Sequence, residues 1–165
     1  MFDVRQSHLI ERELEEYGVY ASITAGVSMR PLFKTGRDMV IIEKPKGELS
    51  RFDVALYRSR SGAYTLHRVI RVKDDEYLIR GDNTFRIEHI AKDRIIGVLT
   101  AFNRKGKRHS IDELGYRIYS RIWNFIYPIR YIIHLPRPLL GKIYRKFFRG
   151  IYHKLFKRDK EEARK

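Results

Sequence analysis

The chain contains no cysteine, and this absence removes three kinds of chemistry. Without thiols the protein can form no disulfide, bind no metal through thiolates and use no cysteine nucleophile. Other ligand patterns are missing as well: the 6 histidines show no HExxH spacing, and the glycines form neither a GxGxxG motif nor a phosphate-binding loop. We therefore expect no metal site and no cofactor.

Long apolar runs are also missing. The first residues, MFDVRQSHLIERELEEY, carry charges where a secretory signal peptide has its apolar segment. The nearest candidate for a membrane span, residues 122–140, is interrupted by Arg130, Arg137 and three prolines, so we expect it not to cross a bilayer. The predicted localisation is cytoplasmic, and a peripheral position at the membrane stays open.

The charge of the chain is unevenly distributed. Its formal net charge is +15; residues 1–115 carry 21 Lys and Arg against 17 Asp and Glu, whereas residues 116–165 carry 14 against 3. Such a basic segment suits an anionic membrane surface or a nucleic acid, and nucleic acid is disfavoured because no recognisable binding module accompanies the charge. Residues 137–158, with 8 Lys and Arg beside large apolar residues, are the predicted membrane contact. Alternatively, their apolar stripe packs on the rest of the protein.

Apolar periodicity divides the sequence into three parts. Residues 3–17 have apolar residues at helical spacing and predict an amphipathic helix. Residues 19–102 contain six short β-type runs, VYASI, DMVII, DVALY, AYTLHRVIRV, EYLIR and IIGVL, separated by turn residues. After a basic loop at residues 103–109, Ser110 and Glu113 form a capping-box pattern for a helix that continues to Pro128. A second basic helix is expected over residues 139–156.

A chain of 165 residues with 43% hydrophobic and 13% aromatic residues can bury a core of its own. The predicted fold is mainly β, of the α+β class. An N-terminal helix and an antiparallel β domain are expected over residues 1–109, and a basic amphipathic helical extension over residues 110–165.

Three polar residues in the β-rich part are candidates for catalysis. Ser28 lies in the turn-like run TAGVSMRP, and a serine hydroxyl is a weak nucleophile until a base removes its proton. His67 lies in YTLHRVIRV, where strand alternation predicts that it points away from Leu66, toward a cleft. Asp82, in the turn RGDN, could accept a hydrogen bond from an imidazole. Each also has an ordinary explanation, as a turn serine, a half-exposed strand histidine and a turn aspartate.

The order of these residues and their surroundings resembles the serine peptidase family that includes type I signal peptidases and the self-cleaving phage and SOS repressors. The matching segments are GVSMRP, DVALY, LHRVI, RGDN and IIGV, within about residues 24–100. In that family the serine of Ser-Met-x-Pro is the nucleophile, which corresponds to Ser28. Bacterial signal peptidases and the repressors use a lysine base. His67 makes this chain more similar to the endoplasmic-reticulum and archaeal branch, whose assisting aspartate corresponds to Asp82.

The sequence departs from this family in several places. Gly26 stands where many signal peptidases have a hydroxyl residue that helps to bind the oxyanion, so backbone N–H groups, that of Ser28 included, are expected to take this role. The best match for a further acidic residue after the Gly-Asp-Asn segment is Glu88. We expect no N-terminal membrane anchor of the signal-peptidase type. In the Ser28 loop, Met29 is expected to pack beneath the chain and Pro31 to restrain the turn.

The resemblance implies a serine endopeptidase that cleaves a peptide, leader or signal-like segment by a Ser-His-Asp mechanism. The substrate is expected to bind as an extended strand along a sheet edge, with small residues next to the cleaved bond. Self-cleavage also stays open, with Ala25-Gly26 as a conceivable site. The alternative is a noncatalytic binding protein of the same fold that associates with a membrane or a nucleic acid.

Overall fold

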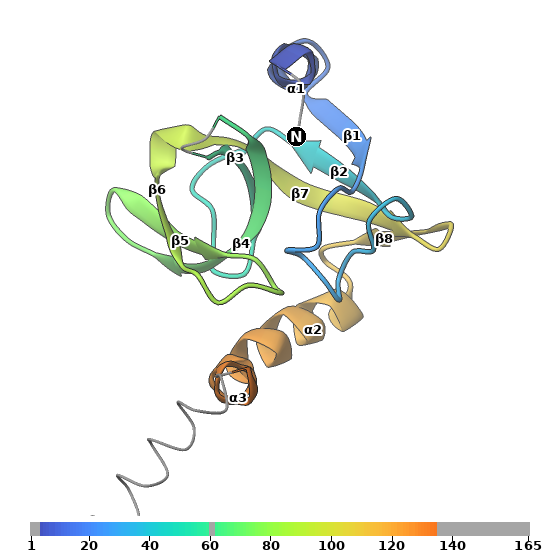
Figure 1. The fold of residues 1–165 in the computed structure, drawn as a ribbon. Coiled ribbons are helices and arrows are strands. Elements are labelled where there is room, and N and C mark those ends of the chain that lie inside the picture. Colours follow the sequence, from blue (N-terminus) through green and yellow to red (C-terminus); the bar gives the residue numbers. More distant parts are fainter. Residues whose placement is uncertain (1–3, 60–61, 135–165) are drawn as a thin grey trace, which may run out of the picture. The chain divides into compact units, whose positions relative to one another are not determined.

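The six predicted β-type runs all form strands, and two further strands complete one antiparallel sheet (Figure 1). The computed structural model describes residues 4–59 and 62–134. Its strands are β1 (Val19–Ile23), β2 (Met39–Glu43), β3 (Val54–Arg58), β4 (Tyr64–Val72), β5 (Glu76–Arg80), β6 (Glu88–Ala91), β7 (Ile95–Arg104) and β8 (Lys107–Ser110). Its helices are α1 (Val4–Glu16), the short 3-10 helix η1 (Lys92–Arg94), α2 (Leu114–Phe125) and α3 (Tyr127–Ile133). The expected mainly β, α+β fold, with a helix before the sheet and helices after it, is confirmed.

The long strand β7 joins the two halves of the sheet. The strand order is β1-β2-β7-β3-β4-β5-β6, and β8 also pairs with β7. β3 pairs with residues 95–98 of β7, and β8 pairs with residues 101–104. β3 and β8 therefore pair with different parts of the same long strand. β2 also pairs with β7, at residues 98–103.

The basic loop predicted at residues 103–109 is instead a β-hairpin. Lys105 and Gly106 have φ angles of 51° and 78°, and Arg104 pairs directly with Lys107. Positive φ at both central residues is typical of the type I′ turn that closes a two-residue hairpin. The sequence prediction failed here because β8, with the sequence KRHS, has no apolar alternation.

Two hydrophobic clusters lie on opposite faces of β3. Val54 and Leu56 belong to the first cluster, which also includes residues of α1, β2 and β7, whereas Ala55 and Tyr57 belong to the second, which also includes residues of β4, β5 and β6. All four of these side chains are buried. A strand covered on both faces is expected to be continuously apolar, which explains the run VALY.

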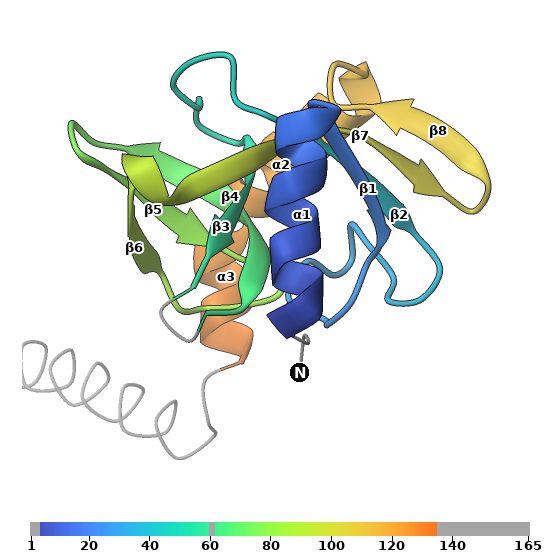
Figure 2. The same ribbon diagram turned by 90° about the horizontal axis from the view of Figure 1, so that it is seen from above.

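Helix α1 closes the first cluster. Ile10 and Leu14 are its buried residues, and Figures 1 and 2 both show α1 beside β1. A Cβ at Gly97 of β7 would lie 2.4 Å from Cγ2 of Ile42 and 3.5 Å from Cδ1 of Leu14. The missing side chain at this glycine therefore leaves room mainly for Ile42 of β2, and Leu14 of α1 packs beside the same position.

The chain divides into two compact units, residues 1–125 and 126–165. α2 belongs to the first unit, and α3, in the second, exposes Ile129, Ile132 and Ile133. Among the described residues, no helix is long and apolar enough to cross a membrane. The basic helix expected over residues 139–156 and the membrane contact predicted at residues 137–158 lie outside the described residues.

The capping pattern at Ser110 forms a turn that precedes α2. The Ser110 N–H donates to Oε1 of Glu113 at 3.0 Å, and its Oγ accepts from the Asp112 N–H at 3.1 Å. The hydrogen bond that a capping box requires, from the Ser110 N–H to the Glu113 carboxylate, is therefore present, but the regular helix begins later, at Leu114.

We predict that Leu14→Ala lowers the free energy of unfolding by about 2–5 kcal/mol, because Leu14 is 1% exposed and its loss leaves a cavity. The matched control is Leu9→Ala on the same helix, where the side chain is 55% exposed and the expected change is within about 0.5 kcal/mol. Urea denaturation of both variants measures the difference. Equal effects would show that α1 is not packed as described.

Candidate active site

His67 lies in β4, directly opposite Ala55 of β3. Directly opposed residues share a face of an antiparallel sheet, so His67 lies on the side of the second core cluster, with Ala55 and Tyr57. The residue is only 6% exposed. The ordinary explanation of His67 as a half-exposed strand histidine is therefore wrong, because both faces of this part of the sheet are covered.

The Nδ1 atom of His67 has two polar neighbours. It lies 3.0 Å from the Tyr57 hydroxyl and 3.2 Å from Oε1 of Glu88, the first residue of β6. Burial raises the pKa of Tyr57 above its ordinary value, and the charge of Glu88 raises it further, so the phenol keeps its proton. A carboxylate can only accept a hydrogen bond, so its position favours a proton on Nδ1 and leaves Nε2 as the acceptor.

Burial also affects the charge of the imidazole. It lowers the pKa of His67 below the ordinary value, and the neighbouring Glu88 carboxylate opposes this shift. The lowered pKa keeps His67 neutral at neutral pH, and neutral imidazole is the form that can accept a proton.

Gly81, just after β5, lies between the His67 imidazole and the backbone of Ser28. A Cβ at this position would lie 2.7 Å from the Ser28 carbonyl oxygen and 2.9 Å from Nε2 of His67. Only a residue without a side chain fits between these atoms. Nε2 is buried and has no hydrogen-bond partner in the part of the chain that the structure describes, an uncommon state for a buried polar atom.

The Ser28 loop follows β1 and is attached to the sheet at several points. Gly26 has a φ angle of 78°, which favours glycine, and Met29 is buried in the first core cluster, as expected for it. The Arg30-Pro31 peptide bond is cis. The Asn83 N–H donates to the Ser28 carbonyl oxygen at 2.7 Å. The turn that contains Gly81 and Asn83 therefore also fixes the position of the Ser28 backbone.

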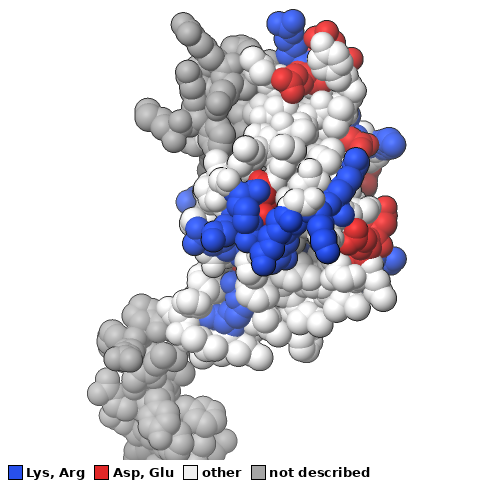
Figure 3. Space-filling model, turned by 90° about the vertical axis from the view of Figure 1, so that its right-hand side faces the viewer, with Lys and Arg blue, Asp and Glu red and all other residues white. Residues whose placement is uncertain are grey.

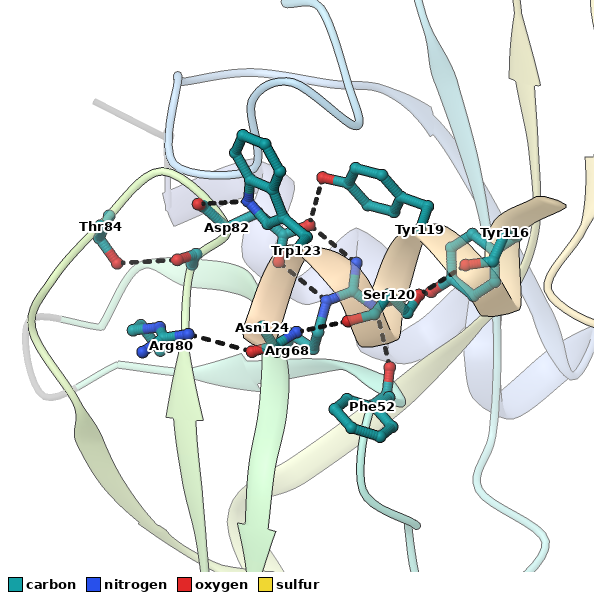
Figure 4. Close-up of polar contacts among 11 residues, drawn as sticks. Phe52, Arg68, Arg80, Asp82, Thr84, Tyr116, Tyr119, Ser120, Trp123 and Asn124 are labelled. Carbon is teal, nitrogen blue, oxygen red and sulfur yellow. Dashed lines mark hydrogen bonds and ion pairs between the residues drawn. The ribbon is translucent and has the colours of Figure 1, made fainter. Parts of the chain in front are cut away.

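Asp82 does not contact His67 through its carboxylate, contrary to the prediction that it orients the imidazole. Its Oδ1 and Oδ2 accept hydrogen bonds of 2.8 Å from Nε and Nη2 of Arg68, and Oδ2 also accepts one of 3.0 Å from the Tyr119 hydroxyl (Figure 4). Among the described residues, the carboxylate next to Nδ1 of His67 belongs to Glu88, which the sequence identified only as a further acidic residue.

The polar side of α2 holds the Arg68–Asp82 pair in place. The Arg68 Nη1 donates to Oγ of Ser120 at 2.9 Å and to the Phe52 carbonyl at 2.9 Å, while Nε1 of Trp123 donates to the Asp82 carbonyl at 2.8 Å. Figure 4 shows these side chains converging from α2 onto the guanidinium and the turn. Both partners of the ion pair are almost fully buried, with side-chain exposures of 0% and 2%. The helix therefore belongs to the support of the candidate site.

A pocket of about 200 Å³ borders Ser28. β1 and β4 form two of its walls, and its lining combines small residues next to the serine with larger apolar ones. The lining residues are Ile10, Tyr20, Ser22, Ile23, Thr24, Ala25, Gly26, Ser28, Met29, Phe33, Val40, Ile42, Leu56, Tyr64, Thr65 and Leu66. The pocket can therefore take an apolar group next to the serine.

Sequence reasoning missed several residues of this arrangement. Arg68 carried one available signal, a charge within an apolar strand run, which demands a buried partner. The positions of Tyr57, Tyr119 and Trp123 follow from strand pairing and helix docking, which a single sequence does not reveal.

Comparisons with known proteins give no independent family assignment. No family model matches the chain, and no curated protein matches it. The interpretation of the site therefore rests on its own geometry and on the motif segments of the sequence.

We predict that Gly81→Ala lowers the free energy of unfolding by about 1–3 kcal/mol, because the new methyl group would overlap a backbone oxygen and a buried imidazole. The control is Gly115→Ala in α2, where no atom lies within 4 Å of the added Cβ, so stability should stay the same or rise by up to about 1 kcal/mol. Urea denaturation tests stability, and the imidazole NMR signals of His67 should move only in the Gly81 variant. Unchanged His67 signals in that variant would contradict the close approach.

Proposed function

We propose that the chain is a serine endopeptidase in which Ser28 is the nucleophile and His67 the general base. The observation that carries this proposal is the unpartnered Nε2 of the buried imidazole beside the Ser28 loop. An imidazole can activate a hydroxyl when one ring nitrogen is free to accept the proton and a carboxylate next to the other nitrogen stabilises the imidazolium that forms. The resemblance of the motif segments to signal peptidases and repressor proteases supports the same function.

In the proposed reaction, Oγ of Ser28 attacks the scissile carbonyl carbon while Nε2 of His67 accepts the hydroxyl proton. Backbone N–H groups near Ser28 stabilise the oxyanion, since Gly26 has no hydroxyl to offer. The protonated imidazole then gives its proton to the leaving amine, and an acyl-enzyme remains. Water, deprotonated by the same imidazole, hydrolyses the ester and restores the serine.

We assign to Glu88 the orienting role that the sequence suggested for Asp82. Its carboxylate lies 3.2 Å from Nδ1, where it can hold the required tautomer and stabilise the imidazolium formed during the reaction. Asp82 supports the site indirectly, through its ion pair with Arg68 and through the turn that holds Ser28.

The proposed substrate is an extended peptide, such as a leader or signal-like segment. β1 is the terminal strand of the sheet, so one of its edges is unpaired among the described residues. A second unpaired edge belongs to residues 64–67 of β4, because β5 pairs with β4 only from residue 68 to residue 72 in the described part of the chain. Both of these edges border the pocket next to Ser28. A peptide strand can pair there and insert a small apolar side chain into the pocket. A cytoplasmic location, peripheral at the membrane, is part of the same proposal.

The first test is cleavage of a peptide library by the wild type, Ser28→Ala and His67→Ala. We expect each substitution to lower kcat/KM by at least about a thousandfold, because nucleophile and base act as a unit. Ser22→Ala, which changes another serine of the pocket lining, is the matched control and should stay active. Mass spectrometry of the purified chains detects self-cleavage at the exposed Ala25-Gly26 bond. Equal results for all four chains would favour the noncatalytic binding protein.

The second test is the pH dependence of cleavage. Because burial lowers the pKa of His67, the neutral base persists as the pH falls below about 6.5, and activity should drop only at lower pH. Glu88→Gln removes a charge that raises this pKa. The acid limb should therefore move to still lower pH, and the rate at neutral pH should fall at least about tenfold because the imidazole loses its orienting carboxylate.

The control for Glu88→Gln is Glu76→Gln. Glu76 likewise contacts a histidine, with Oε1 2.9 Å from Nδ1 of His89, but this pair is on the surface. Its substitution should leave the pH profile unchanged. An identical effect of both substitutions, or an acid limb above pH 7, would refute the assigned roles of Glu88 and His67.

A further inference from the structure

α2 turns its hydrogen-bonding aromatic and polar residues toward the protein and a row of purely apolar residues toward solvent. A helix that packs on a domain normally buries its apolar face. Here the inward side hydrogen-bonds Arg68 and Asp82, while Leu114, Ile118, Ile122 and Phe125 are 72%, 47%, 55% and 83% exposed. The sequence spacings of 4, 4 and 3 residues put these four side chains on one face. We call this row the outer stripe of α2.

From Leu114 onward the charges around the outer stripe are of one sign, whereas exposed Asp112 and Glu113 come just before its first residue. Arg117 and Arg121 are exposed, and their spacing from Leu114 and Ile118 puts each beside the stripe. Residues 114–158 contain 11 Lys and Arg and no Asp or Glu. An apolar stripe with cations along its sides is typical of helices that lie in a membrane interface, where the apolar groups enter the acyl region and the cations meet anionic headgroups.

Further cations lie beside the start of α2. Figures 1 and 2 both show β8 next to the first turn of this helix, and Figure 3 shows Lys and Arg gathered in a band on the side of the molecule that carries β8. The exposed cations of the β7–β8 hairpin and of the loop before β2 are Arg30, Lys34, Arg37, Arg104, Lys105, Lys107 and Arg108. Buried Asp38 links the two segments, since it accepts hydrogen bonds from the Arg37 side chain and from the backbone N–H groups of Lys34 and Lys105.

Charge disfavours other partners that could cover the outer stripe. A second copy of α2 would bring its own arginines against Arg117 and Arg121, and residues 135–158 of the same chain carry only basic charges. Like charges brought together repel. A nucleic acid would satisfy the cations through its phosphates but would leave the four apolar side chains in water.

We propose that the outer stripe of α2 docks the protein on an anionic lipid bilayer. Leu114, Ile118, Ile122 and Phe125 enter the interface, and Arg117 and Arg121 meet the headgroups. Because the inner side of the same helix holds the Asp82 turn, docking sets the candidate site at a fixed distance from the membrane surface. This inference is independent of the peptidase function, since it requires only lipid binding.

The absence of cysteine allows a direct test in the full chain. Ile122→Cys and Leu9→Cys each introduce a single thiol at an apolar helical residue that is 55% exposed, and each is labelled with an environment-sensitive fluorophore. The probes are vesicles of phosphatidylcholine and phosphatidylglycerol in a two-to-one ratio, and vesicles of phosphatidylcholine alone. We expect a blue shift and quenching by acyl-chain nitroxides at position 122 with the anionic vesicles only, and neither effect at position 9.

Flotation with the same vesicles measures affinity. The double substitution Ile118→Glu with Ile122→Glu should lower the partition coefficient at least about tenfold, because two apolar side chains no longer leave water. The same change at exposed Leu9 and Val19 should lower it much less, although the change in net charge is identical. Circular dichroism verifies that the variants fold.

Several results would overturn the proposal. Binding of the chain to anionic vesicles without a shift at position 122 would mean that other residues make the contact. A shift that depends on protein concentration without lipid would identify a second copy as the occupant. A shift produced by RNA, or by an acidic protein but by no vesicle, would assign the surface to that partner, and absence of any binding would leave the stripe without a membrane role.

Discussion

The buried ion pair between Arg68 and Asp82 is the contact on which the candidate site depends. Its side chains are 0% and 2% exposed, so removing one partner would leave a charge in the interior, at a cost of about 3–5 kcal/mol. Hydrogen bonds from Tyr119 and to Ser120 satisfy further polar groups of the pair. Arg68 belongs to β4 and Asp82 follows β5, so their contact fixes the turn in which Gly81 and Asn83 hold the Ser28 loop. The pair thus acts on the site through the backbone.

Two polar networks meet at this part of β4, one on each face. Adjacent residues of a strand point in opposite directions, so His67 joins Tyr57 and Glu88 on one face while Arg68 joins Asp82 and α2 on the other. The strand between them keeps the guanidinium away from the imidazole. This separation matters because a permanent positive charge near His67 would disfavour the imidazolium that a general base must become.

The sequence predicted much of the fold but only part of the site. Continuous apolar runs identified six strands, since burial on one or both faces leaves a strong signal, whereas β8 was missed because its hairpin depends on the turn at Gly106 and its residues are polar. The backbone of Ser28 lies near His67, on the other side of Gly81, as the motif order led us to expect, but the imidazole Nε2 has no hydrogen-bond partner among the described residues. The partner of the imidazole was assigned wrongly because Asp82 and Glu88 both follow β5, and only the pairing of Arg68 with Asp82 shows which carboxylate stays near the histidine.

The alternation of His67 and Arg68 along one strand also limits how the chain can vary in length. Three positions of β4 that pair with β3 precede these residues, and only beyond them, between Val69 and Arg71, does a bulge interrupt the pairing with β5. Inserting or deleting one residue within the strand residues 64–66 would turn every later side chain of β4 to the other face. The guanidinium would then face the serine loop and the imidazole would be trapped against α2. Natural length variants of this protein should therefore have their insertions elsewhere, for example in the turn between β3 and β4.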